Sequence, residues 1–293
     1  MLALNKILVP VDFSERSLAA ARHAALIAER FGSQVTLLYV RPHPPYVDAG
    51  LADLYASGGK MLPEAEVKAR LSQRMDQFSE QTLPGRPVEK LILEGDPAAR
   101  VEELVEQRGI ALVMIPTRGY GTFRRLLLGS VTAKVLHDVS VPVFTGVHAD
   151  GQAPYPSERY ERVACAIDLG PQSEAILRWA LGFAQAWQAQ LTVVHAAPFV
   201  EVRVDRAHFV TADWRAMTVR AAEQEIKNLL NKIGAKAKLR LDNGHPVHFV
   251  TAAAEAKADC LVIGRGLAKG RSSRLPTHAY GIIRESPCAV ISV

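Results

Sequence analysis

Short apolar runs alternate along the chain with longer amphipathic stretches. The apolar runs are rich in Val, Ile and Leu and show no polar alternation, which is typical of strands covered on both faces. In the first half, strands are expected near 6–11, 35–40, 87–93, 111–115 and 141–146, and helices near 15–31, 64–81, 97–108 and 130–138. In the second half, strands are expected near 162–167, 190–196, 236–241, 259–263 and 288–293, and helices near 171–187, 213–233, 246–257 and 277–285.

The alternation of strand and helix predicts an α/β fold. A strand that is followed by a helix and a further strand favours a parallel sheet with right-handed crossovers. We therefore expect two tandem doubly wound domains, each with a five-stranded parallel sheet and helices on both faces. Asp96 is expected to be the N-cap of a helix and Pro97 its first residue. The segment 41–62 is expected to be an inserted loop or lid.

The two halves of the chain repeat one another. The stretch KILVPVDFSE from Lys6 parallels RVACAIDLGP from Arg162, so that Asp12 corresponds to Asp168. Likewise, Gly-Asp-Pro at 95–97 corresponds to Gly-His-Pro at 244–246. A repeat of this length indicates a duplicated domain and not a short-period solenoid. We expect an N-terminal domain over 1–147, a polar linker over 148–160 and a C-terminal domain over 161–293.

Composition narrows the class of protein. The 293 residues are 48% hydrophobic and 22% charged, which is typical of globular proteins and sufficient for two cores. The net charge of +5 is spread along the chain, so no nucleic-acid partner is expected. No apolar run approaches the ~18 residues of a membrane span, and the first residues lack the layout of a signal peptide. Cys165, Cys260 and Cys288 lie in or beside strand-like runs, which favours buried thiols and a cytoplasmic protein.

The stretch TRGYGTFRRLLLGSV, which begins at Thr117, carries the candidate chemistry. It follows an expected strand and precedes an expected helix, at the sheet edge where doubly wound folds bind ligands. Gly119 has no Cβ, so a phosphate could approach its backbone. Gly129 and Ser130 lie where free N–H groups at the start of a helix favour an anion. The spacing alone allows two interpretations: a phosphate-binding loop, or two simple turns with Ser130 as an N-cap.

With these residues in place, the sequence resembles a tandem universal stress protein over nearly its whole length. The nucleotide motif of that family is Gly, two residues, Gly, nine residues, Gly, then Ser or Thr. Here the motif reads Pro116-Thr117-Arg118-Gly119, nine residues, Gly129-Ser130, and RLLLGSV is typical of the family. Pro116 departs from the family's glycine and removes a backbone donor. The resemblance implies a Rossmann-like fold of the adenine nucleotide alpha hydrolase-like kind and a site for ATP, with or without Mg²⁺.

The resemblance also implies which residues contact the nucleotide. They are Pro10, Val11 and Asp12 after the first strand, Val40 after the second, Ile115, Arg118 and Gly119 beside the loop, and Gly129, Ser130 and Val131 at the helix start. Asp12 could accept hydrogen bonds from ribose hydroxyls, or it could be the N-cap of the helix near Ser14. In the second half, Leu267 replaces the second glycine and Thr277-His278 replaces Gly-Ser. We therefore expect one competent nucleotide site, in the N-terminal domain.

No catalytic residue and no metal-binding residue is expected. The motif region offers no carboxylate for magnesium besides Asp12, and the histidines lack metal-ligand spacing. The expected function is that of an ATP-binding module in stress response and signalling. A weak ATPase and a scaffold of the same fold that binds no nucleotide are the alternatives. The last apolar strand of each half is expected to pair the two domains as a pseudo-dimer, and two chains are expected to form a homodimer.

Overall fold

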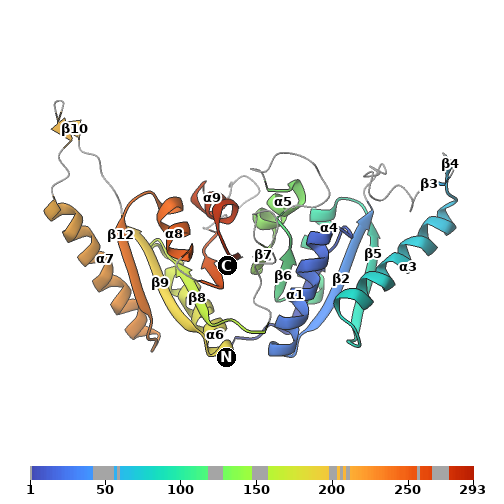
Figure 1. Ribbon diagram of the computed structural model, residues 1–293, viewed down its shortest axis with the longest axis horizontal. Coiled ribbons are helices and arrows are strands. Elements are labelled where there is room, and N and C mark those ends of the chain that lie inside the picture. Colours follow the sequence, from blue (N-terminus) through green and yellow to red (C-terminus); the bar gives the residue numbers. More distant parts are fainter. Residues whose placement is uncertain are drawn as a thin grey trace. The chain divides into compact units, whose positions relative to one another are not determined.

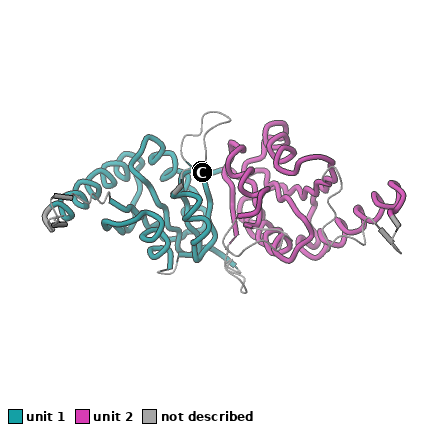
Figure 2. Tube along the Cα trace, turned by 90° about the horizontal axis from the view of Figure 1, so that it is seen from above, with its two compact units in different colours: residues 1–2, 147–293 teal, residues 3–146 magenta. Residues whose placement is uncertain are grey.

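The computed structural model describes residues 2–41, 56–57, 60–117, 128–146, 158–197, 203–204, 207–208, 212–255, 258–265 and 277–293. The chain forms two compact units, which Figure 2 colours separately. One unit comprises residues 3–146, and the other comprises residues 147–293 together with the first two residues. In each unit, helices cover both faces of a parallel sheet (Figure 1).

The N-terminal unit contains a parallel sheet with the strand order β7-β6-β1-β2-β5. Its strands are β1 (Lys6–Pro10), β2 (Gln34–Arg41), β5 (Val88–Glu94), β6 (Leu112–Ile115) and β7 (Val143–Thr145). Its helices are α1 (Glu15–Phe31), α3 (Glu64–Thr82), α4 (Pro97–Arg108) and α5 (Ser130–Asp138). Within the expected lid, β3 (Ala56–Ser57) and β4 (Lys60–Met61) pair antiparallel, and most of that segment lies outside the described residues.

The C-terminal unit repeats this architecture with the strand order β12-β9-β8-β13-β14. Its strands are β8 (Arg162–Ala166), β9 (Gln190–Ala197), β12 (Lys238–Asn243), β13 (Cys260–Ile263) and β14 (Ala289–Ser292). Its helices are α6 (Ser173–Trp187), α7 (Ala212–Lys232), α8 (Pro246–Glu255) and α9 (Thr277–Glu285). The two-residue strands β10 (Arg203–Val204) and β11 (Ala207–His208) also pair antiparallel. Lys6 pairs with Gln34 as Arg162 pairs with Gln190, so the repeat extends to the strand register.

The predicted fold class is confirmed, with small differences in the bounds of the elements. Helix α6 begins at Ser173 and not at 171, because the preceding residues form a turn in which the Ser173 N–H donates to the Gly170 carbonyl at 3.0 Å. Asp96 is the N-cap of α4, its carboxylate accepts from the Ala99 N–H at 3.0 Å, and Pro97 is the first helical residue, as predicted.

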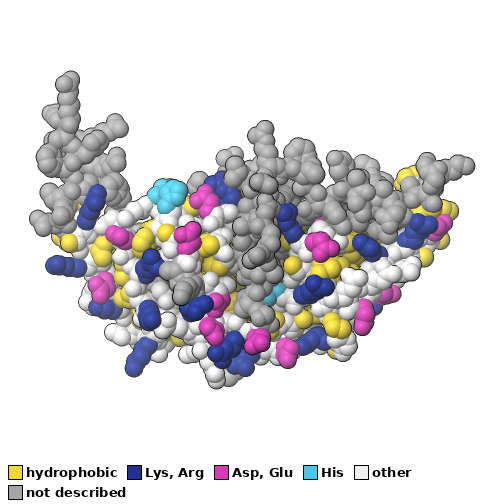
Figure 3. All heavy atoms as spheres, in the orientation of Figure 1, with side chains coloured by type: hydrophobic (Ala, Val, Ile, Leu, Met, Phe, Trp, Pro, Cys, Tyr) yellow, Lys and Arg dark blue, Asp and Glu magenta, His cyan; other side chains and the backbone are white. Residues whose placement is uncertain are grey.

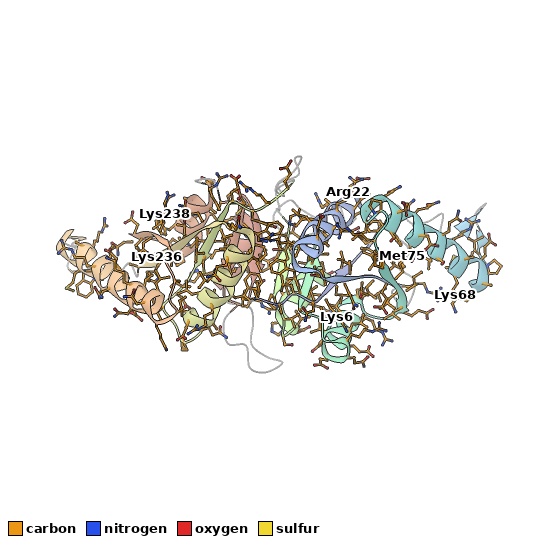
Figure 4. All side chains as sticks on the ribbon, turned by 90° about the horizontal axis from the view of Figure 1, so that it is seen from below. Lys6, Arg22, Lys68, Met75, Lys236 and Lys238 are labelled. Carbon is orange, nitrogen blue, oxygen red and sulfur yellow. The ribbon has the colours of Figure 1, made fainter. Side chains whose placement is uncertain are left out.

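The core of each unit is apolar and covered on both sides. Every residue of β6 and β13 is buried, which explains why these strands have no polar face. Met75, labelled in Figure 4, is 1% exposed on the buried face of α3. Burial of such a side chain contributes about 1.5–3 kcal/mol to folding.

The three cysteines are buried and free, as predicted. Burial raises the pKa of Cys165 and of Cys260 well above the ordinary value. Burial also raises the pKa of Cys288 to about 11, against the opposing effect of a hydrogen bond with Ser286. Because the thiolate is the reactive form of cysteine, these thiols are structural groups.

Candidate functional site

The N-terminal sheet has its topological switch point between β1 and β6. The chain passes from β1 to β2 and β5 on one side, and then returns to β6 and β7 on the other. Ile7 and Leu8 of β1 pair with Leu112 and Val113 of β6, so both strands end at the same edge. Ligands of doubly wound folds bind beyond the carboxyl ends of the strands at such a point.

Asp12 lies directly after β1 at this edge. Its Oδ1 accepts from the Ser14 backbone N–H at 3.0 Å and from the Ser14 hydroxyl at 2.5 Å. Ser14 is the N-cap of α1 and accepts from the Ser17 N–H at 3.2 Å. The alternative that Asp12 itself caps the helix is therefore wrong. Phe13, between Asp12 and Ser14, has a φ of 63°, which is uncommon for a residue other than glycine. This residue turns the chain from β1 into α1.

Helix α5 begins without a side-chain cap. Its N-cap is Gly129, which has no side chain to accept a hydrogen bond. The alternative that Ser130 caps the helix is wrong, because Ser130 is the first helical residue and is exposed. By contrast, Ser14 and Asp96 cap α1 and α4 with their side chains. The first N–H groups of α5, at the positive end of the helix dipole, therefore receive no hydrogen-bond acceptor from a cap side chain.

Two hydrogen bonds fix the start of α5 to the chain that leaves β6. The Gly129 N–H donates to the Thr117 carbonyl at 2.8 Å. The Thr132 hydroxyl donates to the Pro116 carbonyl, also at 2.8 Å. Because β6 pairs with β1, these contacts hold the uncapped helix start at the switch point.

The other predicted contacts are distributed around this edge. Val40 and Ile115 are 8% and 5% exposed, so their side chains belong mainly to the core. The Val11 N–H donates to the Leu38 carbonyl at 2.8 Å and is already used. Pro10 and Val131 are partly exposed. Arg118 and Gly119 lie outside the described residues.

The repeat explains how the fold accommodates Pro116. The strand registers make Pro116 the counterpart of Gly264, and the repeat that matches Asp12 with Asp168 makes Ala20 the counterpart of Ile176. A Cβ at Gly264 would lie only 2.4 Å from Cδ1 of Ile176. The C-terminal unit thus combines Gly264 with the large side chain of Ile176. The N-terminal unit instead combines the buried Pro116 with the small side chain of Ala20.

Gly264→Ala is expected to lower the free energy of unfolding by about 1 kcal/mol, because Cδ1 at the end of the Ile176 side chain must turn away from the new methyl group. In the double variant with Ile176→Ala, the cost should be smaller than the sum of the two single costs by about 0.5–1 kcal/mol. All three tryptophans lie in the C-terminal unit, so urea unfolding followed by tryptophan fluorescence measures the relevant transition. Additive costs would show that the two side chains do not share this space.

Sequence reasoning missed two residues that support the site. Ser14 is held by Asp12, and the short spacing Asp-Phe-Ser was an available signal. Lys134 of α5 lies 3.1 Å from the Asp96 carboxylate of α4. The Ala99 N–H and the Lys134 ammonium lower the pKa of Asp96, which keeps this cap ionised. The sequence gives no sign of this second contact, because 38 residues separate the partners.

The C-terminal unit keeps the geometry of this edge with different residues. Oδ1 of Asp168 accepts from the Gly170 N–H at 2.8 Å and from the Ser173 hydroxyl at 3.3 Å. A crevice of about 240 Å³ lies beside it, lined among others by Asp168, Ile176, Gly264 and His278. Arg265, just after β13, is partly buried, and burial lowers its pKa to about 10.

Among the described residues, no group of three or more His, Cys, Asp or Glu side chains is arranged to hold a metal ion. Within the same ranges, no helix combines the length and the apolar character that a membrane crossing requires.

The fold defines a class of protein: two doubly wound α/β domains in one chain, each with a topological switch point beside its first strand. The model of the "Universal stress protein family" matches residues 3–145 and 159–293. The chain therefore belongs to the universal stress protein family.

Relatives support this assignment. The universal stress protein MJ0531 of Methanocaldococcus jannaschii is 31% identical over 139 residues, which cover 47% of this chain and 79% of that protein. The universal stress protein YxiE of Bacillus subtilis is 25% identical over 142 residues, which cover 47% of this chain and 96% of the relative. The crystal structure of a universal stress protein from Archaeoglobus fulgidus shares the fold with a TM-score of 0.68 at 20% identity, covering 99% of this chain and 96% of the other.

Proposed function

We propose that the N-terminal domain binds ATP and that the protein acts as an ATP-binding module of stress response and signalling in the cytoplasm. The observation that carries the proposal is the start of α5, where Gly129 leaves the first N–H groups without a side-chain cap. This helix start is fixed at the switch point of the sheet by its hydrogen bonds to Thr117 and Pro116. Membership of the universal stress protein family supports the same position.

Each part of the nucleotide has a chemical counterpart at this edge. The N–H groups at the start of α5 suit the phosphates. Asp12 is a carboxylate at the end of β1 and suits the ribose hydroxyls, which donate hydrogen bonds. Because the Val11 N–H is used by Leu38, adenine would meet carbonyl acceptors there, which match its amino group. A Mg²⁺ ion would be held chiefly by the phosphates, as is common for this ion.

Asp12→Asn tests the ribose contact. The asparagine keeps the shape of the side chain but replaces one acceptor oxygen by a donor, so ATP should bind about tenfold more weakly. Isothermal titration calorimetry with ATP and Mg²⁺ measures the change. Asp168→Asn is the matched control, because Asp168 makes the same kind of local hydrogen bonds in the other domain. No heat from the wild-type protein with millimolar ATP would overturn the proposed function, and phosphate release would favour the ATPase alternative.

A further inference from the structure

The C-terminal domain contains a hollow of about 700 Å³ between the end of β9, the helix α7 and the start of α8. Its lining includes Leu169, His195, Ala222, Glu225 and His245. The nucleotide motif contributes none of these five residues. The hollow adjoins the smaller crevice, since Asp168, Ala196 and Pro246 line both.

In the N-terminal domain, aromatic side chains fill the equivalent place. The strand register matches His195 with Tyr39. The repeat that matches Asp12 with Asp168 also matches Phe13 with Leu169, and the φ angles of Phe13 and Leu169 are 63° and 61°. Phe13 stacks on Tyr39 with ring centroids 4.8 Å apart, and it meets Phe78 of α3 edge-on at 5.7 Å. Smaller and more polar residues thus replace a packed aromatic cluster, and they leave a hollow.

His195 forms the buried floor of this hollow. Its side chain is 4% exposed, and its Nδ1 lies 2.8 Å from the Ile167 carbonyl oxygen. Because a carbonyl can only accept, Nδ1 carries the proton, and in the neutral ring Nε2 presents a lone pair. No contact of the described residues uses Nε2. Nε2 is not among the buried polar atoms that lack a partner, and His195 lines the hollow, so this lone pair is open to a donor from water or from a ligand.

The two carboxylates of the hollow, Asp168 and Glu225, also accept hydrogen bonds. Glu225 of α7 is exposed and lines the hollow, and no ion pair joins it to another residue in the described part of the chain. Asp168 uses Oδ1 for Gly170 and Ser173, which leaves Oδ2 for a ligand. The Thr218 hydroxyl is already used, since it donates to the Arg215 carbonyl and accepts from Asn243.

We propose that this hollow binds a small organic cation. Its ammonium group donates hydrogen bonds to Asp168, Glu225 and Nε2 of His195, and its aliphatic part lies against apolar residues such as Ala222 and Pro246. An anion would meet two carboxylates without compensation, and a neutral polyol would leave their charge unbalanced. The proposal does not depend on ATP binding in the other domain.

Three histidines near the hollow determine the pH at which binding should be measured. The His245 ring lies 5.1 Å from that of His248 and 5.4 Å from that of His278, between ring centroids. Figure 3 shows histidine side chains gathered over α8. When protonated, these rings would repel a cation, so binding is measured at pH 8, where histidine side chains are ordinarily uncharged.

Calorimetry of the full chain with three probes of similar length tests the charge of the ligand. We expect saturable heat from 1,5-diaminopentane. The neutral 1,5-pentanediol and the anionic glutarate should bind at least about tenfold more weakly, because neither compensates the carboxylates. No saturable heat from the diamine would overturn the proposal, and so would equal affinity for the diol.

Two variants test the position of the site. Glu225→Gln should weaken diamine binding by about tenfold, and Ala222→Leu should abolish it by filling the hollow. Glu80→Gln, an exposed change on α3 of the other domain, is the matched control and should bind as the wild type does. Tryptophan fluorescence confirms that the C-terminal domain of each variant is folded, since all three tryptophans lie there. Unchanged affinity in folded Glu225→Gln would place the diamine elsewhere and overturn the assignment.

Discussion

Gly129→Val is expected to weaken ATP binding by about a hundredfold while the protein stays folded. The backbone of Gly129 has φ −60° and ψ 147°, an extended conformation that any residue adopts. The valine side chain would instead stand where phosphates approach the first N–H groups of α5. A hydrogen bond to a charged group contributes about 1.5–3 kcal/mol. The loss of one or two such bonds therefore corresponds to about a hundredfold in affinity.

Calorimetry with ATP and Mg²⁺ measures this effect, and thermal unfolding checks the fold. Gly244→Val is the matched control, because Gly244 also lies close to a helix start, two residues before α8, and a Cβ there would meet no heavy atom within 4 Å. It should leave both ATP affinity and melting temperature nearly unchanged. Wild-type affinity in Gly129→Val would mean that the phosphates do not approach α5, and the proposed site would then be wrong.

The pattern of apolar residues was sufficient to predict the main strands and helices. Strands such as β6 are continuous apolar runs because helices cover both faces, and the helices between them are bounded by recognisable caps such as Asp96 and Gly109. The short pairs β3–β4 and β10–β11 were not predicted. Two-residue strands contain no periodicity, and only their antiparallel pairing defines them.

The candidate site could be predicted only where its residues adjoin a strand end or a helix start. Asp12 and Gly129 satisfy that condition. The fit of Ile176 over Gly264 joins residues 88 positions apart, and only the fold shows it. The hollow at His195 is harder still to predict, because it arises from side-chain volume that is missing relative to Tyr39 and Phe13. No motif in a single sequence indicates missing volume.

His23 is expected to make the stability of the N-terminal domain depend on pH between about 7 and 5. The residue lies in α1, is 4% exposed, and its ring lies 5.2 Å from that of Phe144 between centroids. Burial lowers its pKa from 6.5 to about 3. Between these two values the unfolded chain binds a proton that the folded protein excludes, so the free energy of unfolding falls as the pH decreases. Above about pH 6.5 this contribution is constant.

The expected loss of stability follows from the pH range over which only the unfolded chain binds the proton. Each pH unit below about 6.5 costs about 1.4 kcal/mol, so this histidine removes about 2 kcal/mol of stability at pH 5. The partners of Glu89 and Asp96 lower the pKa values of those carboxyl groups. These two carboxylates stabilise the folded protein above their ordinary pKa values, and this contribution is lost as the pH falls through their lowered pKa values. Between pH 7 and pH 5 it is therefore nearly constant.

His23→Leu isolates the effect, because leucine is similar in size to histidine, suits a buried position and cannot titrate. Urea unfolding of the N-terminal domain, followed by circular dichroism at pH 7 and pH 5, gives the loss of stability for each protein. The wild type should lose about 2 kcal/mol more than the variant, and His248→Gln, an exposed change in the other domain, should behave as the wild type. Equal losses in wild type and His23→Leu would mean that the folded protein accepts the proton in this range, which burial against Phe144 should prevent.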